Sequence, residues 1–158
     1  MREWYDEKFF LESKGAKLSA KRNVLRLKKY TFESVLDVGC GEGHLVEILN
    51  TRRIRAKGVD FSPYAGKRIP YDFTLADAKS LPFKDNEFDV VISSDFFEHI
   101  YEEGIDEIYK EMQRVSKKYV MAMISFKKHT KREIDTHVTV RPVEWWEKKL
   151  PRVIILNK

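Results

Sequence analysis

The segment that most constrains the fold is an apolar run that leads into three alternating glycines, Val35-Leu36-Asp37-Val38-Gly39-Cys40-Gly41-Glu42-Gly43-His44-Leu45. The apolar residues predict a buried strand. The glycines predict a tight loop, because a residue without a Cβ atom lets backbone N–H groups approach a ligand closely. Residues 44–50 then show a helical pattern, so the loop is expected to deliver a bound group to a helix N-terminus.

The spacing of these glycines differs from the dinucleotide-binding pattern. That pattern, Gly-x-Gly-x-x-Gly, requires a third glycine at the position that His44 occupies. Glu42 also lies in the loop, where its carboxylate would repel a pyrophosphate but not a cationic ligand. The loop therefore favours a cationic or zwitterionic ligand and disfavours a nicotinamide dinucleotide.

Strand-like and helical segments alternate along the rest of the chain. We expect strands at 34–38, 54–60, 72–76, 88–93, 119–124 and 153–156, and helices at 3–11, 18–29, 44–50, after Ser62-Pro63, at 105–115 and from 141. Such alternation implies right-handed βαβ units and a doubly wound α/β fold with a mostly parallel sheet. No repeat or linker divides the chain, so residues 1–158 are expected to form one domain. Ligands of such sheets bind at the carboxyl ends of the strands.

Five motifs, in this order, resemble those of the class I S-adenosylmethionine (SAM) dependent methyltransferases. They are the glycine segment, Gly58-Val59-Asp60-Phe61-Ser62, Ala76-Asp77-Ala78, Leu81-Pro82-Phe83 with the strand 86–94, and Phe97-Glu98-His99-Ile100. The resemblance covers residues 34–125 and implies a Rossmann-like fold, SAM as cofactor and methyltransferase activity. The family usually closes with an antiparallel hairpin. Here one candidate strand remains, so we expect a shortened substrate-side end at 126–158.

The resemblance also implies which residues contact the cofactor. They lie at the ends of the first four strands: Asp37, Gly39, Cys40, Gly41, Gly43, Asp60, Phe61, Asp77, Ala78 and Ser93. Asp37 would hold the methionine ammonium, Asp60 the ribose hydroxyls, and Asp77 with the Ala78 N–H the adenine. Phe61 would pack against the adenine ring. Purely structural alternatives stay open, since aspartates cap loops and turns and Phe61 could belong to the core.

The candidate general bases are three histidines, His99, His129 and His137, because imidazole titrates near neutral pH. Histidine at position 99 could instead order its loop. The segment 93–96 lacks the Asn-Pro-Pro-Tyr type of motif found in families that methylate adenine or exocyclic nitrogens, which disfavours that chemistry. The chain has four histidines without metal-ligand spacing, so the sequence predicts no metal site. Cys40 lacks a partner base nearby and is a poor candidate nucleophile.

Composition leaves the methyl acceptor open. The net charge of +5 and basic clusters such as 127–132 are compatible with an RNA substrate. However, aromatic and basic residues are separated in the sequence, so we favour a small-molecule acceptor, with residues 1–30 as a helical lid. A non-catalytic SAM-binding or partner-binding subunit is a further alternative.

Three other expectations follow from the residue content. A single cysteine, no bilayer-length apolar run and no signal-peptide pattern predict a cytoplasmic protein. The abundance of Lys and Glu resembles a thermophile's composition. An uncovered sheet edge predicts a homodimer, with Trp145 or Trp146 near the contact.

Overall fold

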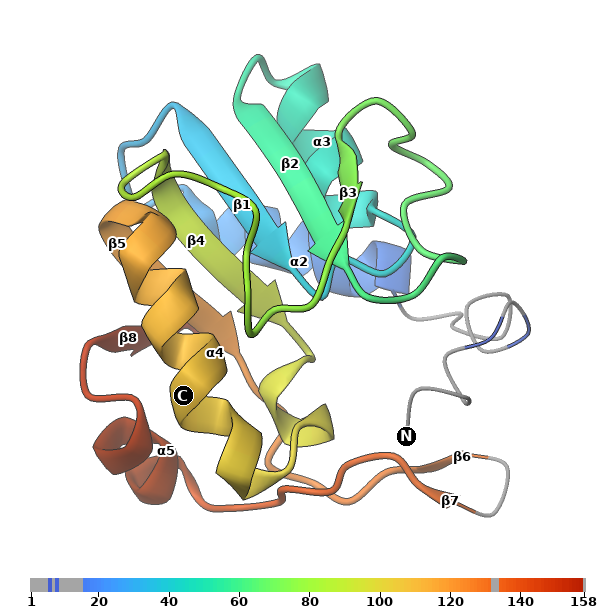
Figure 1. Cartoon of the computed structure of the whole chain (residues 1–158), viewed down its shortest axis with the longest axis vertical. Helices are drawn as coiled ribbons and strands as arrows, with labels where there is room; N and C mark the ends of the chain where they lie inside the picture. Colours follow the sequence, from blue (N-terminus) through green and yellow to red (C-terminus); the bar gives the residue numbers. More distant parts are fainter. Residues whose placement is uncertain (1–5, 7, 9–15, 132–133, 158) are drawn as a thin grey trace.

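The computed structural model describes residues 6, 8, 16–131 and 134–157 and arranges six strands in one sheet between helices (Figure 1). The strands are β1 (Ser34–Val38), β2 (Arg55–Asp60), β3 (Phe73–Leu75), β4 (Phe88–Ser94), β5 (Ser116–Met123) and β8 (Val153–Ile155). They lie in the order β3-β2-β1-β4-β5-β8, and every neighbouring pair is parallel. The predicted doubly wound α/β fold is confirmed, with the reversal of strand order between β1 and β4.

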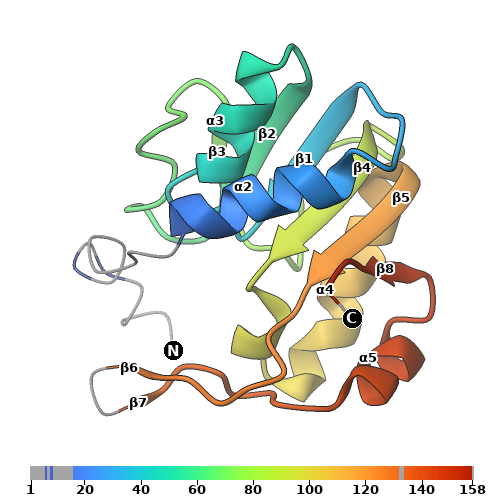
Figure 2. The same ribbon diagram turned by 180° about the vertical axis from the view of Figure 1, so that it is seen from behind.

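Helices cover both faces of the sheet. One face carries α2 (Ala16–Leu27) and α3 (His44–Thr51), whereas α4 (Glu102–Val115) and α5 (Val143–Lys149) lie on the other (Figure 2). Strand β1 contributes to both cores, because successive side chains of a strand point to opposite faces. Val35 packs with the α2 and α3 residues, and Leu36 packs with those of α4 and α5.

The buried faces of the helices follow the apolar pattern of the sequence. In α4, the apolar residues at helical spacing, Ile105, Ile108, Met112 and Val115, are all buried against the sheet. Helix α2 buries Ala20, Asn23, Val24 and Leu27 against the opposite face. Residues 16–27 of the segment predicted as a lid therefore belong to the layer that covers the sheet. Most of 1–15, which holds the aromatic start and the predicted helix 3–11, lies outside the described residues.

The prediction of a short helix after Ser62 is wrong, because residues 61–72 form a series of turns. The Ser62 hydroxyl accepts a hydrogen bond from the Tyr64 N–H at 3.3 Å, as expected of a helix cap. The chain then reaches Gly66, whose φ of +68° turns it away from a helical path, and Pro70 follows.

Two short elements were not predicted. A 3₁₀ helix, η2 (Phe97–His99), follows β4, and an antiparallel ribbon of β6 (Thr130–Lys131) and β7 (Ile134–Asp135) follows β5. The ribbon extends beyond the carboxyl ends of the central strands (Figure 1). It brings the 127–139 segment toward the end of β4.

The two tryptophans of α5 have different surroundings. Trp146 is fully buried in the core, so of the two residues predicted to lie near a dimer contact Trp145 is the one still available, and the dimer itself stays a prediction. Trp145 is half-buried, with the Arg141 guanidinium 5.6 Å from its ring centroid.

The edge strands of the sheet, β3 and β8, have three residues each. Within the part of the chain that the structure describes, no helix has the length and apolarity needed to cross a bilayer.

Candidate functional site

The predicted cofactor residues gather where β1, β2, β3 and β4 end. Asp37 pairs in register with Gly58 of β2 and Ile92 of β4, and the next residue, Val38, pairs with Ser93. This edge lies at the reversal of strand order, where ligands of open parallel sheets bind. The topology therefore brings residues from four separate parts of the chain to one place.

Close packing explains two of the glycines in the loop between β1 and α3. Gly39 has φ +74°, and a Cβ atom there would lie 2.2 Å from Cδ2 of Phe96. Gly43 has φ +91°, and a Cβ atom there would lie 2.4 Å from Cγ1 of Ile69. Any larger residue at either position would be strained and would displace its neighbour.

The N–H groups of this loop bond within the protein. Those of Gly39 and Cys40 donate to the Val59 carbonyl at 2.8 and 3.1 Å, and that of Gly43 donates to the Cys40 carbonyl. The sequence suggested a loop of N–H donors for a ligand. In the structure these N–H groups instead hold the loop in shape, and the Gly41 N–H bonds to Asp60. Glu42 turns toward His44, with Oε2 3.1 Å from Nε2.

Asp37 is a buried carboxylate that lacks a full set of partners. It is 3% exposed, and within the described residues its Oδ1 atom has no hydrogen-bond partner. Burial, followed by the nearby charges of Asp60 and Asp95, raises its pKa from 3.8 to about 8. A buried oxygen without a partner costs folding free energy unless a cation or a hydrogen-bond donor contacts it. The position of Asp37 Oδ1 therefore suits an ammonium group.

Asp60, at the end of β2, holds the loops around it together. Its Oδ2 accepts the Gly41 N–H at 3.1 Å and its Oδ1 accepts the Ser62 N–H at 3.0 Å. Burial raises its pKa, and these backbone hydrogen bonds oppose that shift. The backbone N–H groups of Ser62, Gly41 and Phe61 all act on this carboxylate, so the protein supplies most of the donors that it can accept.

The residues predicted to meet adenine lie at the same edge. Phe61 is half-buried directly after Asp60. Asp77 caps its own turn, because its Oδ1 accepts the Lys79 N–H at 3.0 Å, while Ala78 packs against the core. Asp77 therefore caps a turn, which was the structural alternative to binding adenine. A contact with adenine would have to use its other carboxylate oxygen.

The end of β4 is tied to helix α2, a link that the sequence did not reveal. The Ser19 hydroxyl donates to Asp95 Oδ2 at 3.0 Å, and the buried Asn23 amide donates to Ser94 Oγ at 3.1 Å. Asp95 has φ +51°, so its backbone is strained at the point where the strand ends. The polar Asn23 on the apolar face of α2 was the one available signal.

Two small side chains complete the lining of the β1–β4 edge. Ser93 is fully buried, and its hydroxyl has no hydrogen-bond partner among the described residues. Burial raises the pKa of the Cys40 thiol well above its ordinary value. A thiol held neutral in this way is a poor nucleophile.

The three candidate bases, far apart in sequence, lie side by side in the structure. The ring centroids of His99 and His137 are 4.8 Å apart, and those of His129 and His137 are 5.2 Å apart. The His99 Nδ1–H donates to the Thr136 carbonyl at 2.8 Å. This hydrogen bond holds the 127–139 segment against η2.

The chemistry of this cluster is that of neutral imidazoles beside a buried acid. Burial, followed by the charge of His137, lowers the pKa of His99 to about 4. Burial also lowers the pKa of His137, and it raises that of Glu98 to about 8. A base with a pKa near 4 removes protons weakly at neutral pH, so His99 is a poorer general base than the sequence indicated.

The whole edge is acidic although the protein is basic. The charges of Asp60 and Asp95 raise the pKa of Asp37, and the charge of Asp95 raises that of Glu98. A cationic ligand reduces their mutual repulsion, whereas a phosphate increases it. The residues present thus fit a zwitterionic amino-acid group with a sulfonium, which is the charge pattern of SAM.

Comparison with known proteins gives a family match over most of this region. A family model described as a methyltransferase domain matches residues 36–124. The match begins in β1, ends just after β5, and includes every predicted cofactor residue.

Relatives resemble parts of the chain. Over 70 residues it is 39% identical to arginine-hydroxylase NDUFAF5, mitochondrial, of Danio rerio, covering 40% of this chain and 22% of that protein. Over 96 residues it is 30% identical to norajmaline N-methyltransferase of Rauvolfia serpentina, covering 53% of this chain and 32% of that enzyme. The chain thus spans between a fifth and a third of the length of these two relatives.

A solved structure resembles the fold more completely. The crystal structure of a SAM dependent methyltransferase from Aquifex aeolicus has a TM-score of 0.66 and covers 92% of this chain and 86% of that one. The sequence identity is 18%, so this likeness concerns the fold alone.

Proposed function

The chain belongs to the class I SAM-dependent methyltransferases, whose cofactor is SAM, and we propose that it transfers the cofactor's methyl group to a small-molecule acceptor. The observation that carries this proposal is the buried Asp37 carboxylate of β1, whose Oδ1 has no partner within the described residues, next to the glycine loop that follows the strand. An ammonium group is the partner that such an oxygen needs.

The residues of the edge would divide the work of holding the cofactor. Asp37 would pair with the methionine ammonium, and Asp60 would accept the ribose hydroxyls in addition to the backbone N–H groups that already bond it. Phe61 and Asp77 would contact the adenine. The bound sulfonium supplies an electrophilic methyl group, so the protein's part is to place an acceptor in line and exclude water.

The small-molecule acceptor rests on two supports. The edge is acidic, which disfavours an approaching phosphate backbone. One relative is named as an N-methyltransferase of norajmaline, whereas another is named as an arginine-hydroxylase. The second name makes arginine an acceptor to include in the screen.

Calorimetric titration tests the proposal at the cofactor. We expect SAM and S-adenosylhomocysteine to bind with one site per chain and NAD to give no heat. The Asp37→Asn variant should bind SAM at least about tenfold more weakly, the loss of one charge-assisted hydrogen bond. The matched variant Asp106→Asn changes an exposed carboxylate paired with Lys149 and should bind like the wild type. Heat on adding NAD but not SAM would overturn the proposal.

We also propose, separately, a homodimer in a reducing compartment such as the cytoplasm. The single cysteine supports the compartment. Trp145 is the tryptophan still available to a partner, since Trp146 is buried. Light scattering at high protein concentration tests the dimer, and a monomer there would remove it.

A further inference from the structure

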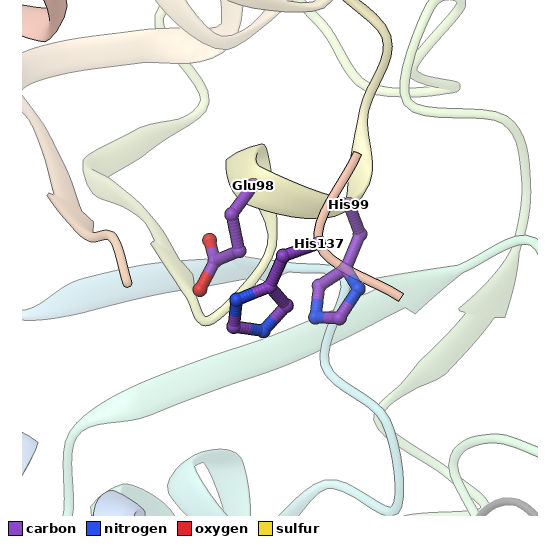
Figure 3. A group of neighbouring side chains, drawn as sticks. All are labelled: Glu98, His99 and His137. Carbon is purple, nitrogen blue, oxygen red and sulfur yellow. The ribbon is translucent and has the colours of Figure 1, made fainter. Parts of the chain in front are cut away.

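A second group of polar side chains lies beyond the end of β4, outside the set predicted to hold SAM. Glu98 and His99 come from η2, and His137 comes from the segment that follows β7 (Figure 3). One potential ligand atom from each residue lies within 4.8 Å of the others. Figure 3 shows the three side chains converging on a common space.

The histidines are oriented as metal-binding histidines are. Nδ1 of His99 lies 2.8 Å from the Thr136 carbonyl oxygen, and Nδ1 of His137 lies 2.6 Å from that of Lys127. A carbonyl oxygen only accepts, so both Nδ1 atoms carry the proton and the lone pair of each neutral ring is on Nε2. Donation of the other ring N–H to a backbone carbonyl is the usual support of a histidine that ligates a metal.

Glu98 supplies the anionic ligand. It is fully buried, and its Oε1 accepts the Ser125 N–H at 2.8 Å. Its Oε2 has no hydrogen-bond partner within the described residues. A buried carboxylate oxygen without a partner is costly, and a cation would remove that cost.

We propose that Glu98, His99 and His137 bind a divalent transition-metal ion, with Zn²⁺ as the reference ion. Two imidazoles and one carboxylate form a donor set that suits Zn²⁺ or Fe²⁺ and leaves coordination positions open. Ligand atoms on one tetrahedral zinc ion lie about 3.3 Å apart. Separations in the cluster reach up to 4.8 Å and must therefore shorten by up to about 1.5 Å, which rotation of the side chains would provide.

The sequence alone disfavoured this site because the ligands do not follow a metal-binding spacing. His137 stands 38 positions after His99, and the ribbon of β6 and β7 brings it back. When occupied, the ion would act as a Lewis acid that lowers the pKa of a bound hydroxyl. That consequence rests on the proposed methyl transfer, whereas binding of the metal does not.

Titration of the protein with Zn²⁺ after treatment with a chelator tests the proposal. We expect one ion per chain with a dissociation constant of micromolar or tighter, and binding of Mg²⁺ at least a hundredfold weaker. Glu98→Gln keeps the side-chain volume, and His137→Ala changes a half-buried residue. Each variant should weaken Zn²⁺ binding at least tenfold.

His129→Ala is the matched control, because His129 is an exposed neighbour outside the three-residue group. It should bind Zn²⁺ within about threefold of the wild type. Circular dichroism and SAM titration on each variant show whether the fold and the cofactor site persist. Absence of Zn²⁺ binding by a wild type that binds SAM would overturn the metal site alone. Full Zn²⁺ affinity in both folded ligand variants, or equal loss in His129→Ala, would overturn it too.

Discussion

At the scale of single residues, the two aspartates that end β1 and β2 have different surroundings. Both oxygens of Asp60 accept backbone N–H groups, so its charge is stabilised by the protein itself. Asp37 is more deeply desolvated, and its Oδ1 has no partner within the described part of the chain. Asp60 therefore mainly holds the loops of the site in place, whereas the Asp37 carboxylate would be stabilised most by a bound ligand.

Replacing Asp60 with Asn should weaken SAM binding by about 1.5–3 kcal/mol, because charge-assisted hydrogen bonds to the ribose become neutral ones or are lost. The unliganded protein should also lose stability, since one of the two backbone N–H groups loses its acceptor. Calorimetry measures the first effect and urea unfolding the second. Unaltered SAM affinity in a folded Asp60→Asn variant would exclude Asp60 as the ribose ligand.

Asp37 predicts a specific dependence of stability on pH. Its pKa is about 8 in the folded protein and 3.8 as a model compound, so between these values only the folded state retains the proton. Stability of the unliganded protein should therefore fall as pH rises from about 4 to 8 and then level off. The Asp37→Asn variant has no group that must lose this proton. Its free energy of unfolding at pH 8 should therefore exceed that of the wild type by more than about 1 kcal/mol.

Urea unfolding of both proteins at pH 5, 6.5 and 8 measures that difference. Because the comparison is between two proteins that both contain Glu98 and His99, the contributions of those groups cancel. Parallel stability curves for the wild type and Asp37→Asn would show that Asp37 is ionised in the folded state.

The sequence located most of this edge but not its chemistry. Asp37 and Asp60 could be found because each stands in a strand that leads into the predicted site. Whether an oxygen has a partner depends on loops that fold back from elsewhere, as Ser62 does onto Asp60. Glu98 was noticed only as the neighbour of His99, because nothing in its local sequence shows that β6 and β7 bring His137 beside it.

At the scale of elements, the loop between β1 and α3 depends on steric fit. The space that a side chain at position 39 would need is filled by Phe96, which follows β4. The loop and the end of β4 are therefore packed as one unit. A change in either should be felt by the other.

Gly39→Ala should destabilise the protein by about 2–4 kcal/mol, because an alanine is strained at φ +74° and its Cβ atom would overlap the Phe96 ring. Adding Phe96→Ala should recover part of the loss, which a double-mutant cycle by urea unfolding measures. Gly104→Ala in α4 is the control, with a nearest contact of 3.3 Å and a helical backbone, and should change stability by less than about 1 kcal/mol. Strict additivity of the two changes would show that Phe96 does not limit position 39.

Elements with a strong periodic pattern were predictable, and those set by distant contacts were not. The helix ending at Val115 matches the structure closely because its apolar residues repeat at the helical period, and the strand 34–38 matches because a short apolar run ends there at a glycine loop. Residues 61–72 have a good helix start, but Gly66 and Pro70 keep them in turns. The two-residue strands β6 and β7 are too short for any period to appear.

At the scale of the whole molecule, the net charge of +5 is partly offset by ion pairs. Several basic side chains already face carboxylates, including Arg68 with Glu47 and Arg114 with Glu111. An exposed pair such as Arg68 with Glu47 contributes little to stability, but both pairs lower the positive potential that a polyanion would meet. The carboxyl edge itself presents Asp37, Asp60, Asp95 and Glu98.

This distribution predicts that RNA binds only through weak, salt-sensitive attraction. In a filter-binding assay with total tRNA and rRNA, we expect binding at low salt that falls steeply and is lost near physiological salt, because each released counterion adds to the salt dependence. Replacing the exposed Lys127 and Lys128 with Glu should reduce the low-salt binding further. An acceptor RNA would behave differently, since stacking and base contacts persist when phosphate attraction is screened. Micromolar binding that survives physiological salt would therefore overturn the small-molecule proposal and make RNA the acceptor to test first.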